Sequence, residues 1–405
     1  MRIAYLTTSG QLGGAERSLL DLLAALRATQ PDWHLRLIAG DDGPLVSRAT
    51  ALGVASTIVP FPRRLSRLGD SASKEHARGR IHLARRCAAA VVAAAPYAVR
   101  LFRALKEAAP DVVHTNGFKM HVLALWARRR QAPVVWHVRD YVGSRPIMAQ
   151  LLRGHAGRCA AVVANSRRVA DDVRTVCGSR LNVYPIHDGI DLADFAPSGP
   201  VLDLDAIASM PPAPPATVRV GLLATMARWK GHPVFLRALS MLPASLPIRG
   251  YVISGPLYQT EGSEFRLADL RAQAAQLGIA NRVGFAGFVD EPAAAMRALD
   301  IVVHASTEPE PFGRVIGEAM ACGRPVIASD AAGAVELLRP GADALTHPSG
   351  DAPILAERIA TLAVNTELRA RLGKNGRLIA EQRFDRGRPA REMIQIYRSL
   401  TAAAN

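Results

Sequence analysis

Short apolar runs alternate with longer amphipathic segments along almost the whole chain, and this alternation constrains the fold more than any other feature of the sequence. In residues 15–26, for example, leucines recur with the period of a helix. Strand-like runs fall at residues 3–7, 35–39, 112–114, 134–137 and 161–164, and again at 218–223, 251–254, 283–285, 301–303 and 325–328. Strands that alternate with helices predict parallel sheets covered by helices.

A proline-rich stretch separates the two series of strands. Residues 203–217 carry four prolines and lack periodicity, which is typical of an interdomain linker or its immediate surroundings. The 405 residues also exceed the size at which one hydrophobic core usually stops growing. We therefore predict an α/β fold with two Rossmann-like, doubly wound domains, at 1–195 and 196–387. The C-terminal helix, 388–405, is a candidate to cross back to the first domain.

Open α/β sheets bind ligands at the carboxyl ends of their strands. Two such domains in tandem imply a central cleft between these ends, so functional residues are expected in the loops there.

Nothing in the sequence predicts export or a membrane span. The opening residues, MRIAYLTTSG, fit a first strand and lack the long apolar stretch of a secretory leader. The longest apolar stretch, residues 87–99, is too short to cross a bilayer and contains Pro96. The four cysteines form no CxxC pair, which argues against a zinc site and against a disulfide framework. A cytoplasmic location is the expectation.

The formal net charge of +15 is concentrated in one segment. Residues 63–106 contain eleven lysines and arginines against two acidic residues, and a helical wheel of residues 78–92 places Arg78, His82, Arg85 and Arg86 on one side. Such a basic amphipathic helix is typical of a solvated helix that packs on its own domain, or of one attracted to an anionic membrane surface. Nucleic acid is the weakest of the three interpretations, because the segment has a single aromatic residue near its centre and no recognisable nucleic-acid module.

The first loop between a strand and a helix contains Gly13 and Gly14. Adjacent glycines at the start of a helix let backbone N–H groups approach a phosphate, and the helix dipole favours negative charge there. A tight turn that needs glycine explains the same pair equally well.

The strongest motif lies between Ser306 and Ala328. An acidic, proline-rich loop leads into a helix that starts near Phe312 and Gly313 and ends at Gly323. Glu310 lies in the loop and Glu318 about two turns into the helix, so both can face one ligand. Carboxylates accept hydrogen bonds from sugar hydroxyls, and free N–H groups at a helix start can hold phosphate. The motif could therefore bind both halves of a nucleotide sugar.

With these motifs in order, the sequence resembles the GT4 family of retaining glycosyltransferases, which have the GT-B fold. The resemblance spans almost the whole chain and rests on several pieces together. They are GGAER at 13–17, WHVRD at 136–140, Asn165-Ser166, HDGID at 187–191 with Phe195, Lys230-Gly231, FAGFV at 285–289, and Glu310 and Glu318 with the family's E-x7-E spacing.

The resemblance implies a role for each matching residue. Glu310 would bind hydroxyls of the donor sugar, His137 would reach the sugar near its C6 position, and Lys230 would neutralise the leaving diphosphate. The donor-binding residues would be Gly13, Gly14, Phe288, Val289, Phe312, Gly313, Arg314, Val315 and Glu318. Within this set Glu318 would bind the ribose, Phe288 and Val289 would border the base, and backbone N–H groups at 312–315 would contact the sugar and diphosphate. For His137 and Phe288 a purely structural place in the core is the alternative.

One position departs from the family. An arginine usually precedes the lysine by five residues, and here that position is Thr225. Arg228, two residues before Lys230, is the nearest basic residue. Either Arg228 takes the missing role in catalysis, or a single cation serves the leaving group.

The implied reaction moves a sugar from a nucleotide-diphosphate sugar to an acceptor hydroxyl by same-face attack, with retention. The acceptor would be a lipid-linked or other saccharide in the assembly of cell-surface polysaccharide or glycoconjugate, at the inner face of the cytoplasmic membrane. No metal is expected, because the adjacent acidic pairs, Asp41-Asp42 and Asp171-Asp172, have no further ligands nearby. Two alternatives stay open: another GT-B enzyme, such as a phosphorylase or an epimerase, and a binder of nucleotide sugars or polyanions without turnover.

Overall fold

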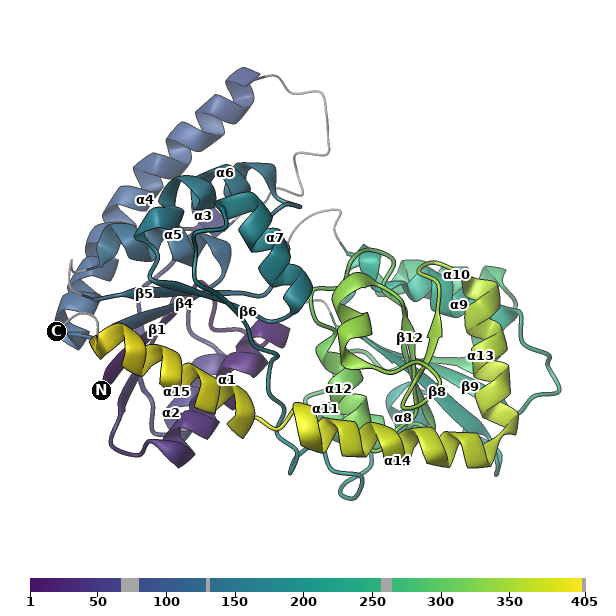
Figure 1. The fold of residues 1–405 in the computed structure, drawn as a ribbon. Helices are drawn as coiled ribbons and strands as arrows, with labels where there is room; N and C mark the ends of the chain where they lie inside the picture. The colour runs from purple at the N-terminus through teal and green to yellow at the C-terminus, as the bar shows by residue number, and fades with distance from the viewer. Residues whose placement is uncertain (67–79, 129–131, 256–263, 403–405) are drawn as a thin grey trace. The chain divides into compact units, whose positions relative to one another are not determined.

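The chain folds into two compact units, which are treated separately below (Figure 1). The computed structural model describes residues 1–66, 80–128, 132–255 and 264–402, without the side chains of Arg64 and of residues 80–93. The first unit contains Met1–Gly189 and Arg386–Asn405, and the second contains Ile190–Asp385. The sequence placed the first boundary at residue 195, whereas the chain passes between the units at 189–190 and returns at 385–386.

In the described residues of the first unit, a parallel sheet has the strand order β3-β2-β1-β4-β5-β6-β7. Its strands are β1 (Arg2–Thr7), β2 (His34–Ala39), β3 (Ala55–Ile58), β4 (Val112–Asn116), β5 (Val134–Val138), β6 (Ala161–Ala164) and β7 (Val183–Pro185). Its α-helices are α1 (Gly14–Thr29), α2 (Pro44–Ala51), α3 (Arg63–Ser66), α4 (Arg80–Ala108), α5 (Phe118–Ala127), α6 (Pro146–His155), α7 (Arg167–Cys177) and α15 (Gly387–Ala402).

Alternate side chains of β1 supply two separate cores, one on each face of this sheet. Ala4 and Leu6 belong to a core with residues of α4, α5, α6 and α7. Ile3 and Tyr5 belong to the other core, with residues of α1, α2 and α15. Because successive side chains of a strand point to opposite faces, this division confirms the predicted doubly wound arrangement.

The C-terminal helix α15 is part of the first unit. Its apolar residues Ala390, Met393, Ile394 and Tyr397 are buried in the core that contains residues of α1. Where the two connecting segments meet, Gly189 has no room for a side chain, because a Cβ there would lie 2.5 Å from the Cα of Arg386. The chain therefore leaves the first unit at Gly189 in close contact with Arg386, where it returns.

The described part of the second unit contains a parallel sheet with the strand order β10-β9-β8-β11-β12-β13. Its strands are β8 (Val218–Leu223), β9 (Ile248–Ile253), β10 (Val283–Phe285), β11 (Ile301–His304), β12 (Val326–Ser329) and β13 (Leu345–His347). Its α-helices are α8 (Leu204–Ile207), α9 (His232–Ser240), α10 (Leu267–Gln276), α11 (Pro292–Arg297), α12 (Arg314–Ala321), α13 (Ala352–Val364) and α14 (Thr366–Arg383). Val302 and Val303, neighbours on β11, lie in different cores, so this sheet too is covered on both faces.

The proline-rich segment 203–217 lies inside the second unit, which begins at Ile190, so it is not the linker itself but part of the chain that follows it. Asp205 in α8 anchors it: the carboxylate accepts hydrogen bonds from Arg249 at 2.6 Å and from the Tyr251 hydroxyl at 2.5 Å. Burial raises the pKa of Asp205, but these hydrogen bonds together hold it below its ordinary value. These prolines, which are typical of a linker, here belong to a surface loop that the hydrogen bonds of Asp205 hold in place.

The basic amphipathic face predicted at residues 78–92 lies outside the residues whose side chains the structure describes. The backbone of α4 is helical over residues 80–108, and Pro96 is inside this helix. In the described part of the chain, no helix is both long and apolar enough to span a membrane.

Candidate functional site

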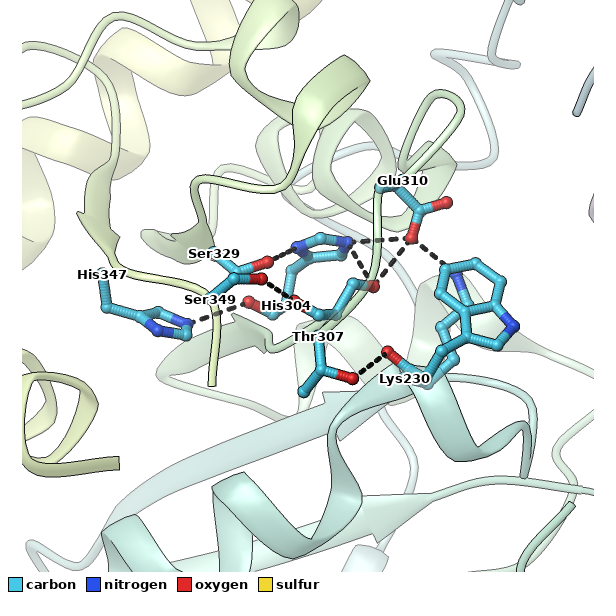
Figure 2. Close-up of polar contacts among 9 residues, drawn as sticks. Lys230, His304, Thr307, Glu310, Ser329, His347 and Ser349 are labelled. Carbon is cyan, nitrogen blue, oxygen red and sulfur yellow. Dashed lines mark hydrogen bonds and ion pairs between the residues drawn. The ribbon is translucent and has the colours of Figure 1, made fainter. Parts of the chain in front are cut away.

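The carboxyl ends of the strands in the second unit gather polar side chains around Glu310 (Figure 2). Its atom Oε2 accepts hydrogen bonds from Lys230 Nζ at 2.7 Å and from Ser306 Oγ at 2.8 Å, and lies 3.1 Å from His304 Nε2. Lys230 follows β8, whereas His304 ends β11 and Ser306 follows it. Two loops of neighbouring strands thus meet on one buried carboxylate, which is 5% exposed.

A second layer of hydrogen bonds holds His304 in place. Its Nδ1 lies 3.3 Å from Ser329 Oγ at the end of β12, and its carbonyl oxygen lies 3.4 Å from His347 Nε2 at the end of β13. Because a carboxylate only accepts hydrogen bonds, the His304 nitrogen that faces Glu310 is the protonated one. The carboxyl ends of four strands therefore contribute to one network (Figure 2).

Electrostatics keep Glu310 ionised in this buried position. Burial raises the pKa of its carboxyl. The Lys230 charge and, after it, the His304 hydrogen bond lower the pKa by more than burial raises it, so the pKa lies well below its ordinary value. A buried carboxylate is stable only with such partners, because desolvation of an unpaired charge costs several kcal/mol or more. The network therefore presents a fixed negative charge beside a fixed positive charge.

Gly231 lets the Lys230 loop approach the end of β11. Its φ is +76°, and a Cβ there would lie 1.8 Å from the carbonyl oxygen of Ala305. The Thr307 N–H also donates to the Trp229 carbonyl at 2.7 Å, and Lys230 Nζ lies 3.9 Å from the centre of the Trp229 ring. Backbone and ring contacts therefore fix the direction of the ammonium group.

Helix α12 begins at Arg314, four residues after Glu310. Gly313, with φ +85°, is its N-cap, and the buried Phe312 packs edge-on against Phe384. The positive end of the helix dipole therefore lies at Arg314 and Val315, close in sequence to the buried ion pair. This is where the sequence predicted contacts to a sugar diphosphate.

Glu318 is held on the same helix. Its Oε1 lies 2.6 Å from Arg314 Nε, one helical turn away, and its side chain is 9% exposed. The structure thus pairs Lys230 with Glu310 and Arg314 with Glu318, so each of the two predicted carboxylates has its own cation.

The remaining predicted residues of the second unit are near the surface. Phe288 is 56% exposed, which excludes the interpretation that it is core, and it lies against Gly255. Val289 packs partly on the core of Phe312. Arg228 is exposed, and its guanidinium carbon lies 4.9 Å above the centre of the Phe265 ring.

In the first unit, the predicted glycine loop starts α1. The Gly13 N–H donates to the Glu16 carboxylate at 3.1 Å, in the manner of a capping box. Gly14 is exposed, and a Cβ there would meet nothing within 4 Å. The Gly13 amide is therefore already used, and the open space lies beside the backbone of Gly14.

His137, at the end of β5, lies in a buried polar cluster. Its Nδ1 lies 3.1 Å from both Arg139 Nη2 and His114 Nε2, and its Nε2 lies 3.9 Å from Asp188 Oδ1. Arg139 also donates to Asp188 at 2.6 Å. Burial, and after it the Arg139 charge, lower the pKa of His137 well below its ordinary value, so the ring is neutral.

Sequence reasoning missed the residues that support these groups. His304, Ser306, Ser329 and His347 all stand at or just after the end of a strand. That position is a usable signal, since parallel strands place their carboxyl ends at one edge of the sheet. In the described residues, no three His, Cys, Asp or Glu side chains form a group that could hold a metal ion.

The chain matches two family models of glycosyltransferases, one over most of each unit. The family model described as "Glycosyltransferase Family 4" matches residues 12–194, and the one described as "Glycosyl transferases group 1" matches residues 215–379. Over 258 residues the chain is 31% identical to a D-inositol 3-phosphate glycosyltransferase of Jonesia denitrificans, which covers 61% of this chain and 58% of that protein. Over 138 residues it is 35% identical to a phosphatidyl-myo-inositol mannosyltransferase of Mycobacterium leprae, which covers 34% of this chain and 36% of that protein. The chain thus matches less than two thirds of the length of either relative.

Among solved structures, the chain is similar to Anabaena HepE in complex with UDP and glucose. The TM-score is 0.79 at 25% sequence identity, over 98% of this chain and 100% of that chain. The likeness and the two parallel sheets show the GT-B type of fold, with two Rossmann-like domains, as the sequence predicted.

Proposed function

The chain belongs to the glycosyltransferases of family 4 and group 1, and from this premise we propose that it moves a sugar from a nucleotide-diphosphate sugar to an acceptor hydroxyl, with retention. The observation that carries the proposal is the Lys230–Glu310 pair beside the start of α12. A cation and a helix N-terminus suit a diphosphate, and a carboxylate suits sugar hydroxyls.

Lys230 and α12 would stabilise the leaving group. Breaking the anomeric C–O bond transfers negative charge to the diphosphate, and preorganised donors aimed at that charge lower the barrier. The ammonium group has three donors, so Lys230 can bind a phosphate oxygen and keep its contact with Glu310. Arg228 is a further candidate cation. For this role its side chain would have to leave the face of the Phe265 ring.

Glu310 and Glu318 would bind different parts of the donor. Glu310 would accept a hydrogen bond from a sugar hydroxyl, as carboxylates do, while Lys230, His304 and Ser306 hold its orientation. Glu318 would accept from the ribose hydroxyls, with Arg314 holding its orientation. The exposed ring of Phe288 and the side chain of Val289 would border the base.

In the first unit, the amide of Gly14 would lie against a phosphate, and His137 would donate to a sugar hydroxyl. Retention would follow from same-face attack, in which the departing phosphate oxygen takes the proton of the acceptor hydroxyl. No metal is assigned a role in this step.

UDP-glucose is the first donor to test, because HepE is described in complexes with UDP, with UDP and glucose, and with UDP-glucose. A lipid-linked or other saccharide is the proposed acceptor class. The curated relatives carry inositol phosphate and phosphatidylinositol in their names, so these compounds belong in the acceptor panel.

Thermal stability against UDP-, GDP-, ADP- and TDP-sugars tests donor binding, because a ligand that binds only the folded state raises the melting temperature by mass action. We expect a rise with one nucleotide class and a smaller rise in Glu318→Ala. Matched controls are the free sugars and Glu357→Ala, an exposed glutamate on α13. No rise with any nucleotide sugar, together with consumption of a saccharide by phosphate, would identify a phosphorylase instead.

Turnover and stereochemistry require product analysis. Incubation of the identified donor with the acceptor panel should yield a product whose anomeric configuration, read from its proton NMR coupling, equals that of the donor. An inverted product would contradict retention. Donor binding without any product across the panel would favour a binder without turnover.

Residues 63–106 would also attract an anionic membrane surface from the cytoplasmic side. In the described part of this segment, α4 exposes Val99 and Phe102 beside the exposed Arg100 and Arg103, which is an apolar pair flanked by cations. Liposome flotation with anionic and neutral lipid tests this. Equal recovery from both, or no loss of binding in Arg100→Glu with Arg103→Glu, would remove the electrostatic attraction.

A further inference from the structure

A chain of hydrogen-bonded rings runs through the interior of the first unit and ends at His137. The hydroxyl oxygens of Tyr5 on β1 and Tyr397 on α15 lie 3.3 Å apart. The Tyr397 hydroxyl lies 2.8 Å from His114 Nδ1, and His114 Nε2 lies 3.1 Å from His137 Nδ1. None of these four side chains is more than 4% exposed, so water does not compete for their hydrogen bonds.

Arg139 fixes the direction of this chain. Its Nη2 lies 3.1 Å from His137 Nδ1, and a guanidinium group only donates. Nδ1 of His137 is therefore an acceptor. Since the ring is neutral, its single proton lies on Nε2.

Each remaining link then has one consistent donor. His114 faces an accepting nitrogen of His137, so its Nε2 donates and its Nδ1 accepts from the Tyr397 hydroxyl. The Tyr397 hydroxyl donates its hydrogen bond to His114 and therefore accepts one from the Tyr5 hydroxyl. The protons point in one direction, from β1 through α15 and β4 to β5.

The chain ends on a donor that has no hydrogen-bond acceptor among the described residues. His137 Nε2 is fully buried, and Asp188 Oδ1 is 3.9 Å away, beyond hydrogen-bond distance. A buried N–H group without an acceptor is costly, and such atoms in native proteins call for a partner. An oxygen of a bound ligand would supply it.

We propose that Tyr397 and His114 are positioning residues that hold His137 as an Nε2–H donor toward a hydroxyl oxygen of a bound sugar. The proposal rests on the proposed glycosyl transfer for its ligand and on the hydrogen-bond chain for its direction. It gives α15 a part in the chemistry beyond packing, because this helix supplies the phenol that orients His114.

Nitrogen NMR of the full chain, labelled at histidine with ¹⁵N, tests the direction without any turnover. Ring nitrogens with and without a proton have distinct shifts, and the signals of the two rings are assigned by their loss in His114→Gln and His137→Gln. We expect Nε2–H on both rings in the wild type, and a mixture of His114 tautomers in Tyr397→Phe. A proton on Nδ1 of His137, or an unchanged His114 in Tyr397→Phe, would overturn the proposal.

Kinetics test the consequence for catalysis. Tyr397→Phe should lower kcat about tenfold, the order of one lost hydrogen bond, with little change in donor KM. The matched control is Tyr5→Phe, which also removes a buried phenol hydroxyl but leaves the Tyr397-to-His114 bond intact, so its kcat should stay within about twofold. Equal losses in the two variants would indicate packing and would overturn the positioning role.

A second pair separates hydrogen bonding from the shape of the ring. His114→Gln keeps a donor toward His137 and should retain more activity than His114→Leu, which has none. If the wild type shows the expected tautomers but turns over no nucleotide sugar, the proposed function fails. If it is active with the opposite tautomers, only the present inference fails.

Discussion

Lys230, which is partly buried, and Glu310, which is buried, form an ion pair in which each charge compensates the other. We expect Lys230→Ala to lower kcat by about 100-fold or more, because a donor to the leaving group is lost. It should also destabilise the second unit by about 3 kcal/mol, since Glu310 stays buried without its cation. Activity assays and urea unfolding measure the two effects.

The double variant Lys230→Ala with Glu310→Gln separates these effects. It removes both charges, so it should recover much of the stability that the single variant loses while remaining inactive. Recovery of activity together with stability would show that Lys230 acts only on the fold. Lys374→Ala, at a surface lysine of α14, serves as the control for loss of a positive charge.

Glu310 also predicts how stability depends on pH. Burial raises its pKa, but Lys230 and His304 lower it more, so the folded-state pKa lies below the ordinary glutamate value. A group with a lowered pKa contributes stability above its unfolded pKa, about 4.3, and loses it as pH falls through the folded pKa. The melting-temperature difference between wild type and Glu310→Gln should therefore be constant from about pH 6 to 8 and shrink in acid. A difference that widens toward acid would contradict this sign.

Among single residues, the sequence predicted Glu310, Lys230 and His137, but not the histidines that contact them, His304 and His114. Spacing within one motif identified the two carboxylates, Glu310 in the loop before α12 and Glu318 within the helix. His304 contacts a residue of another strand, and His114 contacts a residue of α15. These partners are too far apart in the sequence for a short motif to reveal them. Such contacts follow from sheet order, which becomes known only when the fold is known.

Among the elements, the start of α1 offers a clean test of phosphate binding. Gly14→Ala adds a methyl group to open space, at a position without positive φ, so the melting temperature should stay the same or rise. If a phosphate approaches this backbone, the methyl group will obstruct it, and donor turnover should fall about tenfold or more. Differential scanning fluorimetry and initial rates give the two measurements.

Substitutions of two further glycines serve as controls for Gly14→Ala. Gly154 on α6 also has open space around its Cβ position, so Gly154→Ala should leave turnover unchanged. Gly231→Ala should destabilise the second unit by about 2 kcal/mol or more, because of its positive φ and the close Ala305 carbonyl. Equal turnover in the Gly14 and Gly154 variants would exclude a phosphate at α1.

The elements that sequence reasoning missed are edge strands. Ten predicted strands match β-strands of the structure, while β3, β7 and β13 were not expected. These three lie at the edges of their sheets and are short. An edge strand has a neighbour on one side only and is partly exposed, so it lacks the continuous apolar run that identifies a central parallel strand.

For the whole molecule, the position of α15 predicts unequal effects of truncation. A chain that stops after residue 385 lacks the helix that buries Met393 and Tyr397 in the first unit, whereas residues 190–385 keep all of their own core. Hydrogen exchange should show loss of protection in residues 1–189 and retained protection in the second unit. A chain that stops after residue 402 is the control, and uniform loss of protection in the shorter chain would contradict two separate cores.

The double passage of the chain between the units also fixes an order of assembly on the ribosome. Residues 190–385 are contiguous, so the second unit has its complete sequence as soon as its last helix leaves the exit tunnel. The first unit is translated earlier, yet it must wait for the twenty residues that follow before its sheet can be covered. We therefore expect the second unit to complete its folding before the first, opposite to the usual amino-to-carboxyl order. During that interval the exposed sheet face is the part of the protein that a chaperone would meet.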